Sequence, residues 1–331
     1  MSLTRRQLLE RTALGAGVVA FGDLGTLLAA SPASATSGLR RQVAGTRTAA
    51  ELFGSLRPGS SVDLHGEMIE GTDVDSVPAG VTVQNGTFLG QMQLYDADRV
   101  TLEGCTFIGD PTTELKTICK FLGGDGWQVL DSTFRGGVVA SQLGMGLNTR
   151  AKGRQTVPTN WLVDSCTFLP LDGQWGEYPQ GHAIYCLTSP RVRMNARIEH
   201  CSFSGSPFGA PLKLGGTGND PHREGVKGVV VTDCVIGGVP DDAGRCLAVL
   251  TQGQRTNVAL SGCTLTAPEG AIPWVQAMDG ALVSLENTEL PQGVVEYATW
   301  WRGGFIFQTE KKITVAPGEQ PPDIPHHIEW S

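Results

Sequence analysis

Three side chains that can transfer protons lie in two short apolar segments near the middle of the 331-residue chain. His182 and Tyr185 belong to "GHAIYC", and Lys213 belongs to "PLKLGG" about thirty residues later. Imidazole, phenol and amine groups exchange protons near neutral pH when their surroundings shift their pKa values. A histidine bonded to a backbone carbonyl and a lysine on a solvated strand are the alternatives. The three residues are candidates for catalysis if the fold brings them to one surface.

Basic and aromatic side chains gather in the longer segments around these two. The loops at 148–160, 188–196 and 215–228 carry Arg150, Arg191, Arg193 and Arg223. If equivalent loops stack, these arginines form a basic strip on an otherwise acidic chain; ordinary solvated turns are the alternative. The segment "LPLDGQWGEYPQG" at 169–181 adds Trp175 and Tyr178. Such rings stack on sugars or cover an exposed core edge.

A short phrase, written "TLEGCTFIG" around Phe107, recurs along the chain and must form the elements that position these residues. Successive anchors lie 19, 27, 34, 35, 33, 29 and 25 residues apart. Alternation of apolar and polar residues on both sides of a small residue predicts two short strands that meet at a bend. A drifting period with a conserved phrase indicates a solenoid with loops of variable length. The anchors are Phe88, Phe107, Phe134, Phe168, Phe203, Ile236, Leu265 and Leu290.

The bend itself is made of residues that tolerate a left-handed backbone. They are Asn85, Gly104, Asp131, Ser165, His200, Asp233, Gly262 and Asn287. The next position is always small, and it is cysteine at 105, 166, 201, 234 and 263. In-register cysteines on stacked rungs point in parallel, so we expect a buried ladder of free thiols; a disulfide framework is the alternative. No CxxC or CxH spacing favours a metal site.

A third strand precedes the phrase in several repeats, at 117–122, 182–187, 210–214, 246–250 and 272–276. Three short strands in about thirty residues resemble the right-handed parallel β-helix of the pectin-lyase-like superfamily. The resemblance implies an all-β protein with a single right-handed parallel β-helix of about seven to eight coils. The helix is predicted over 60–298, with an N-terminal cap at 36–59 and a C-terminal cap and tail at 299–331. A β-propeller is the competing fold, but its blades need about 40 residues and four strands.

Many proteins of this superfamily bind or cleave polysaccharides in a groove along a parallel sheet. Its lyases remove the proton next to a uronate carboxylate with a basic side chain while cations neutralise that carboxylate. The resemblance therefore implies a polysaccharide lyase that acts on an acidic glycan. Lys213 would be the base, with its pKa lowered by neighbouring positive charge, and His182 or Tyr185 would protonate the leaving oxygen. Arg193 and Arg223 would hold the carboxylate, with Arg150, Arg191, Trp175 and Tyr178 as further substrate-binding residues.

Other functions remain open from the sequence. A glycoside hydrolase needs clustered aspartates, and a calcium-dependent lyase needs several acidic ligands on one face; neither cluster is evident. No cofactor or metal is therefore expected. A non-catalytic glycan-binding or cell-envelope protein is the main alternative. An outward threonine column also suggests ice binding, but its interruptions and the variable loops disfavour that function.

The first 35 residues indicate the destination of the chain. The Arg5-Arg6 pair, the apolar run that follows and "ASA" at 33–35 resemble a twin-arginine export signal. We therefore expect a bacterial protein that is secreted or held in the cell envelope. It should be monomeric and free of the membrane once the signal is removed. A net charge of −8 argues against nucleic acid as a partner.

Overall fold

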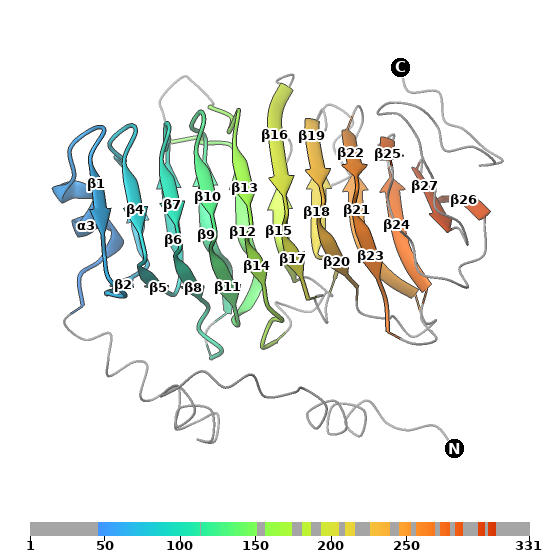
Figure 1. Cartoon of the computed structure of the whole chain (residues 1–331), viewed down its shortest axis with the longest axis horizontal. Helices are drawn as coiled ribbons and strands as arrows, with labels where there is room; N and C mark the ends of the chain where they lie inside the picture. Colours follow the sequence, from blue (N-terminus) through green and yellow to red (C-terminus); the bar gives the residue numbers. More distant parts are fainter. Residues whose placement is uncertain are drawn as a thin grey trace. The chain divides into compact units, whose positions relative to one another are not determined.

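Three long sheets built from short strands make up the fold (Figure 1). The computed structural model describes residues 46–112, 114–150, 156–173, 181–186, 193–204, 209–215, 226–238, 245–252, 256–268, 272–278, 282–286, 297–301 and 304–308. Each coil places one strand in each sheet, and the next coil pairs with it in parallel. The parallel β-helix expected from the sequence is confirmed. The predicted export signal lies outside the described residues.

The strands follow one another in the same order in every coil. The first sheet contains β1 (Ser61–Asp63), β4 (Thr82–Gln84), β7 (Thr101–Glu103), β10 (Gln128–Leu130), β13 (Leu162–Asp164), β16 (Arg193–Glu199), β19 (Lys227–Thr232), β22 (Asn257–Ser261) and β25 (Leu282–Glu286). The second sheet contains β2 (Met68–Glu70), β5 (Thr87–Leu89), β8 (Thr106–Ile108), β11 (Thr133–Arg135), β14 (Thr167–Phe168), β17 (Ser202–Phe203), β20 (Val235–Gly237) and β23 (Thr264–Thr266). The third sheet contains β3 (Asp73–Val74), β6 (Met92–Tyr95), β9 (Glu114–Leu122), β12 (Val138–Gly146), β15 (His182–Cys186), β18 (Leu212–Gly215), β21 (Arg245–Gln252) and β24 (Ile272–Met278).

Both ends of the tube are covered by elements that leave the repeat. At the N-terminal end, α3 (Ala49–Ser55) buries Leu52 and Phe53, and Thr48 caps it through a reciprocal bond with Glu51. At the other end, β26 (Tyr297–Trp301) and β27 (Gly304–Gln308) form a hairpin, and β27 pairs antiparallel with β24. The hairpin thus satisfies backbone groups at the last edge of the third sheet. No helix among the described residues is long and apolar enough to span a membrane.

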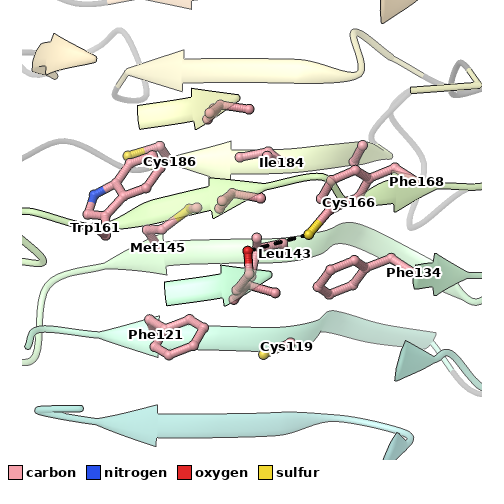
Figure 2. Close-up of a cluster of buried hydrophobic side chains, with 14 of the residues drawn as sticks. Cys119, Phe121, Phe134, Leu143, Met145, Trp161, Cys166, Phe168, Ile184 and Cys186 are labelled. Carbon is pink, nitrogen blue, oxygen red and sulfur yellow. Dashed lines mark hydrogen bonds between the residues drawn. The ribbon is translucent and has the colours of Figure 1, made fainter. Parts of the chain in front are cut away.

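The anchor residues of the phrase form a continuous column inside the tube. Phe88, Phe107, Phe134, Phe168 and Phe203 occupy one register position of the second sheet. Their successive ring centroids are 5.3, 4.5, 4.7 and 4.8 Å apart, with the planes nearly parallel. Figure 2 shows Phe134 and Phe168 in this core with Phe121 and Trp161. The core is therefore a set of stacked ladders, each made of one residue per coil.

Left-handed residues turn the chain between the first and second sheets, as the sequence predicts. Asn85, Asp131, Ser165, His200 and Asp233 have φ between 46° and 55°. Because these corners stack, their side chains meet between coils. His200 Nδ1 lies 2.8 Å from Asp164 Oδ1, and its Nε2 lies 3.9 Å from Asp233 Oδ2. The hydrogen bond to Asp164, followed by the charges of Asp164, Asp233 and Glu199, raises the pKa of His200.

Substituting His200 by asparagine should remove a pH-dependent contribution to stability. Asparagine tolerates the same left-handed corner, as Asn85 shows. Since the folded pKa is raised above the ordinary 6.5, the stabilisation is fully present below that value and is lost as the pH rises through the folded pKa. Urea unfolding of both proteins across this range should show a stability gap that closes with increasing pH. A gap that is constant, or that widens, would contradict the prediction.

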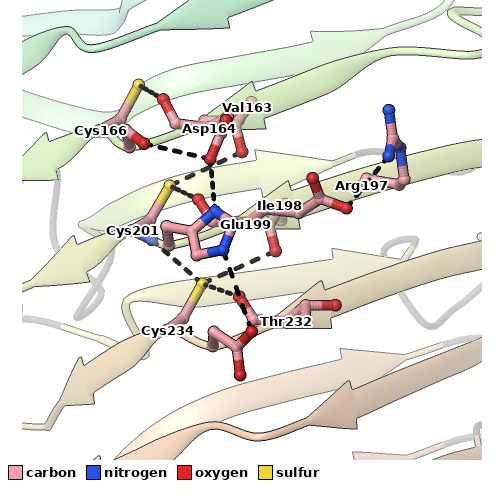
Figure 3. Close-up of polar contacts among 12 residues, drawn as sticks. Val163, Asp164, Cys166, Arg197, Ile198, Glu199, Cys201, Thr232 and Cys234 are labelled. Atoms are coloured by element: carbon pink, nitrogen blue, oxygen red, sulfur yellow. Dashed lines mark hydrogen bonds and ion pairs between the residues drawn. The ribbon is translucent and has the colours of Figure 1, made fainter.

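The cysteine ladder is present, and its thiols are free. Cys105, Cys166, Cys201, Cys234 and Cys263 are buried and unbridged. Each thiol has two acceptors for its single hydrogen, the carbonyl two residues back and a carbonyl in the preceding coil. Cys166 Sγ, for example, lies 3.2 Å from the carbonyl oxygen of Asp164 and 3.5 Å from that of Val129. Figure 3 shows both contacts for Cys201 and Cys234, and the contact of Cys166 to Asp164. Ser132 takes the same position in its coil and donates to Leu130 at 2.7 Å.

The buried thiols should resist modification in the native state. Burial raises the pKa of Cys105 to about 11 and that of Cys186 to about 12, so little thiolate forms near neutral pH. In a Cys246→Ser variant, a thiol-reactive disulfide reagent should leave the seven remaining cysteines unmodified until guanidinium unfolds the chain. Rapid native-state labelling of several thiols would contradict this expectation.

Candidate functional site

The candidate catalytic residues lie on the outer face of the third sheet. Lys120, Gly144, Tyr185 and Lys213 occupy one register position in β9, β12, β15 and β18, which are neighbours in Figure 1. The residues before and after each of them are buried; they include Leu143, Met145, Ile184 and Cys186, seen inside the core in Figure 2. Because side chains alternate along a strand, the column from Lys120 to Lys213 points outward. We call it the Lys120–Lys213 column.

Lys213 and Tyr185 are in direct contact on adjacent coils. Lys213 Nζ lies 4.8 Å from the centroid of the Tyr185 ring, so the lysine leans toward the N-terminal coils. Burial lowers the pKa of Lys213. The sequence-based expectation that neighbouring positive charge causes this shift is not met, because desolvation is the cause. The pKa of Tyr185 is raised, first by burial and then by the nearby Cys186. The pair thus favours a neutral amine beside a protonated phenol.

His182 is placed beside Tyr185, but its surroundings do not fit the predicted role of proton donor. The two ring centroids are 5.5 Å apart, and His182 is 3% exposed. Its Nδ1 lies 2.7 Å from the carbonyl oxygen of Ala210, so this nitrogen donates its proton to the backbone. Burial and the charge of Lys213 lower the pKa of His182 to about 4. A neutral histidine fixed in this way lies beside Tyr185, whose phenol keeps its proton more strongly than usual because its pKa is raised.

A polar row lies next to the Lys120–Lys213 column. Ser141 pairs in register with His182 on one side and with Thr117 on the other. The hydroxyls of Thr117 and Ser141 are 3.1 Å apart, and both residues are buried. A Cβ atom added to Gly144 would lie 3.0 Å from Thr117 Cγ2 and 3.4 Å from Ser141 Oγ. Glycine at position 144 therefore lets the hydroxyl row approach the column closely.

The guanidinium of Arg150 is held by contacts within the protein. Its guanidinium donates to Asp73 at 2.9 Å and to Asp75, and it stacks over Tyr95 at 4.0 Å. Asp73 begins the register column that passes through Gln93 to Lys120. Arg150 therefore ties the segment after β12 back to the first coils. This engagement argues against the predicted substrate-binding role of Arg150.

The remaining predicted binding residues fall elsewhere or outside the described residues. Arg193 is exposed at the start of β16 in the first sheet, where it pairs in register with Lys227. The structure thus places Arg193 beside another basic residue, but on a different sheet from Lys213. The other four lie outside the described residues: Arg191, Arg223, Trp175 and Tyr178. The predicted wall of the groove remains a prediction.

Acidic residues do not surround Lys213 in the described part of the chain. Asp73 is the carboxylate of the register column, four coils from Tyr185, and it is paired with Arg150. No group of three or more histidine, cysteine, aspartate or glutamate side chains gathers among the described residues in a way that could hold a metal ion.

The strand β12 was missed by the sequence analysis. Its segment "VVASQLGMG" contains two glycines and two polar residues, which obscure the alternation that marks a strand. The signal that could have found it is the distance between anchors, since the coil between Phe134 and Phe168 also needs a third strand. Without β12, there was no reason to single out Ser141 or Gly144 from the sequence. Nor did the sequence show that Lys120 and Lys213 occupy the same register position of one sheet.

Comparisons with known proteins add little to this geometry. No protein-family model matches the chain, and no curated protein matches it. Among solved structures, the chain is similar to QnrB1, a plasmid-mediated fluoroquinolone resistance protein, with 11% sequence identity and a TM-score of 0.20. The match covers 70% of this chain and 81% of that one. A likeness at this level supports no argument about function.

Proposed function

We propose that the chain is an exported polysaccharide lyase that cleaves an acidic glycan by β-elimination. The observation that carries the proposal is the contact between Lys213 and Tyr185 on the outer face of the third sheet. A base and an acid on adjacent coils are about 4.8 Å apart along the sheet, which suits proton abstraction and leaving-group protonation on one sugar linkage. No metal is required by this pair.

In the proposed reaction, the neutral Lys213 amine takes the proton from the carbon next to the uronate carboxylate. The electron pair left behind forms a carbon–carbon double bond as the glycosidic oxygen departs. Tyr185 gives its proton to that oxygen and is reprotonated from water, while Lys213 releases its proton to water. Burial supports both roles, because it favours the neutral amine and the protonated phenol.

The arginines predicted to hold the carboxylate enter this proposal differently. Arg223 is retained in that role on the strength of the family resemblance. Arg193 lies on the first sheet and is not assigned to the reacting sugar. The twin-arginine resemblance of the first 35 residues supports export, with an acidic polysaccharide outside the cytoplasm as substrate.

A panel assay tests the proposal. Purified protein is incubated with pectate, alginate and glycosaminoglycan substrates, and the ultraviolet absorbance of the unsaturated uronate product is followed. We expect the absorbance to increase with at least one polymer. Release of reducing ends without this absorbance would indicate a hydrolase. Binding without either signal would indicate a non-catalytic glycan-binding protein. Both outcomes would contradict the lyase proposal.

A further inference from the structure

The amine of Lys213 has no hydrogen-bond or ion-pair partner among the described residues. Its contact is with the face of the Tyr185 ring, where Nζ lies 4.8 Å from the centroid. Two other lysines have side chains that the structure describes, Lys120 and Lys227, and each of them interacts with another residue of the chain. Of the three, Lys213 is therefore the one whose charge no described carboxylate or hydrogen-bond acceptor stabilises.

The surroundings of this amine are apolar along the sheet. Lys213 pairs in register with Tyr185 of β15 on one side and with Leu250 of β21 on the other. Its neighbours along β18, Leu212 and Leu214, are fully buried. A single ring face replaces little of the water that a charged amine loses on burial, and burial lowers the pKa of Lys213. More of this amine is therefore uncharged near neutral pH than of a lysine in water.

Lys213 is nevertheless within reach of small molecules. Its side chain leaves the outer face of β18 and is partly exposed. The thiols of the cysteine ladder, by contrast, are buried inside the tube. Partial exposure lets a reagent of a few atoms reach the amine, whereas the same reagent cannot reach those thiols without unfolding. The structure thus presents one desolvated nucleophile at the surface of the third sheet.

We propose that Lys213 is a site of covalent modification by small aldehydes, which it takes up as an imine. The lone pair of the amine forms a bond to the carbonyl carbon, and the carbon–oxygen double bond opens to give a carbinolamine. Its hydroxyl group leaves as water with the remaining amine hydrogen, and a carbon–nitrogen double bond forms. The step needs no oxidant or reductant. A desolvated lysine is the side chain that forms such imines in proteins.

This modification does not depend on the lyase reaction. It uses the same amine, but it requires neither a uronate carboxylate nor a proton from Tyr185. If the lyase assay fails and an aldehyde is still trapped at Lys213, the modification site stands alone. If lyase activity is present and no aldehyde is trapped there, the modification site is overturned and the lyase stands.

Glycolaldehyde with sodium cyanoborohydride tests the proposal, because hydride from the borohydride converts the imine to a stable secondary amine. The native full-length protein is labelled near neutral pH, and mass spectrometry of its peptides gives the rate at each lysine. We expect Lys213 to be labelled about tenfold faster than Lys120 and Lys227. This preference should vanish in concentrated guanidinium. Equal rates in the native protein, or labelling of Lys213 only after unfolding, would overturn the proposal.

The pH dependence of labelling separates a neutral amine from one that is merely exposed. The rate follows the unprotonated fraction, so labelling of Lys213 should rise at lower pH in the native protein than in the unfolded chain. Tyr185→Ser removes the covering ring and should move the native profile toward the unfolded one. Thr133→Ser, on the outer face of the second sheet, is the matched control and should leave the profile unchanged. Thermal unfolding verifies that both variants fold. Identical native and unfolded profiles in wild type would overturn the proposal.

Discussion

Phe134→Ala should destabilise the protein by about 3–5 kcal/mol. Phe134 is fully buried at the centre of the phenylalanine column. Its ring stacks on Phe107 at 4.5 Å and on Phe168 at 4.7 Å. Alanine would leave a cavity and break both aromatic contacts, each worth about 0.5–1.5 kcal/mol beyond the buried area. Urea unfolding followed by circular dichroism measures the change.

Thr133→Ala is the matched control for this variant. Thr133 is the preceding residue of β11 and lies on the outer face, partly exposed, so its truncation should change stability by no more than about 0.5 kcal/mol. Phe134→Leu should fall between the two, because leucine refills part of the volume but not the stack. Equal unfolding midpoints for Phe134→Ala and Thr133→Ala would mean that the phenylalanine column does not contribute more to stability than an outer-face side chain.

Lys213→Met should abolish measurable lyase activity while leaving the fold intact. General base catalysis contributes about 10²–10⁴-fold to rate, and methionine keeps the length of the side chain without a basic group. Lys227→Met serves as the control and should retain wild-type kcat. The absorbance assay on the responsive polymer measures both, with thermal unfolding as the check on folding.

The pH dependence of the same assay adds a test of the assignment. Only the neutral amine can accept the proton, so kcat/KM should rise with pH toward the pKa of Lys213, which burial holds below 10.5. Tyr185→Phe should lower kcat by removing the acid without shifting this rising limb. Full activity of Lys213→Met would overturn the roles given to the two residues. So would a pH profile of kcat/KM whose rising limb is lost in Tyr185→Phe but kept in Lys213→Met.

The sequence predicted the architecture because each coil repeats the same physical requirements. A left-handed corner at Asn85 or His200, a small residue after it and a large apolar residue two positions later are needed in every coil. Such constraints appear in the sequence as the same residue types at the same spacing in each repeat. The sequence also placed His182 and Lys213 on adjacent coils correctly, because their strands β15 and β18 follow the same phrase.

The chemistry of the site was less predictable, because it depends on contacts that do not repeat. The bond from His182 to Ala210 and the ion pairs of Arg150 join residues with no common spacing. Long loops decide where such side chains go, and loop conformation carries no period. Arg193 illustrates this limit, since the sequence placed it in a basic loop near Lys213, whereas the structure places it in a strand of the first sheet.

Ser132 shows what the cysteine ladder requires of its members. A serine hydroxyl replaces the thiol in one coil and makes the equivalent bond to a backbone carbonyl. From Cys105 to Cys263 the position therefore holds a small hydrogen-bond donor, and a thiol is not required for that bond. The seven cysteines in the described part of the chain are free, and each is present as a protonated thiol that needs no disulfide partner. For these seven positions, forming the coil consequently requires no oxidant.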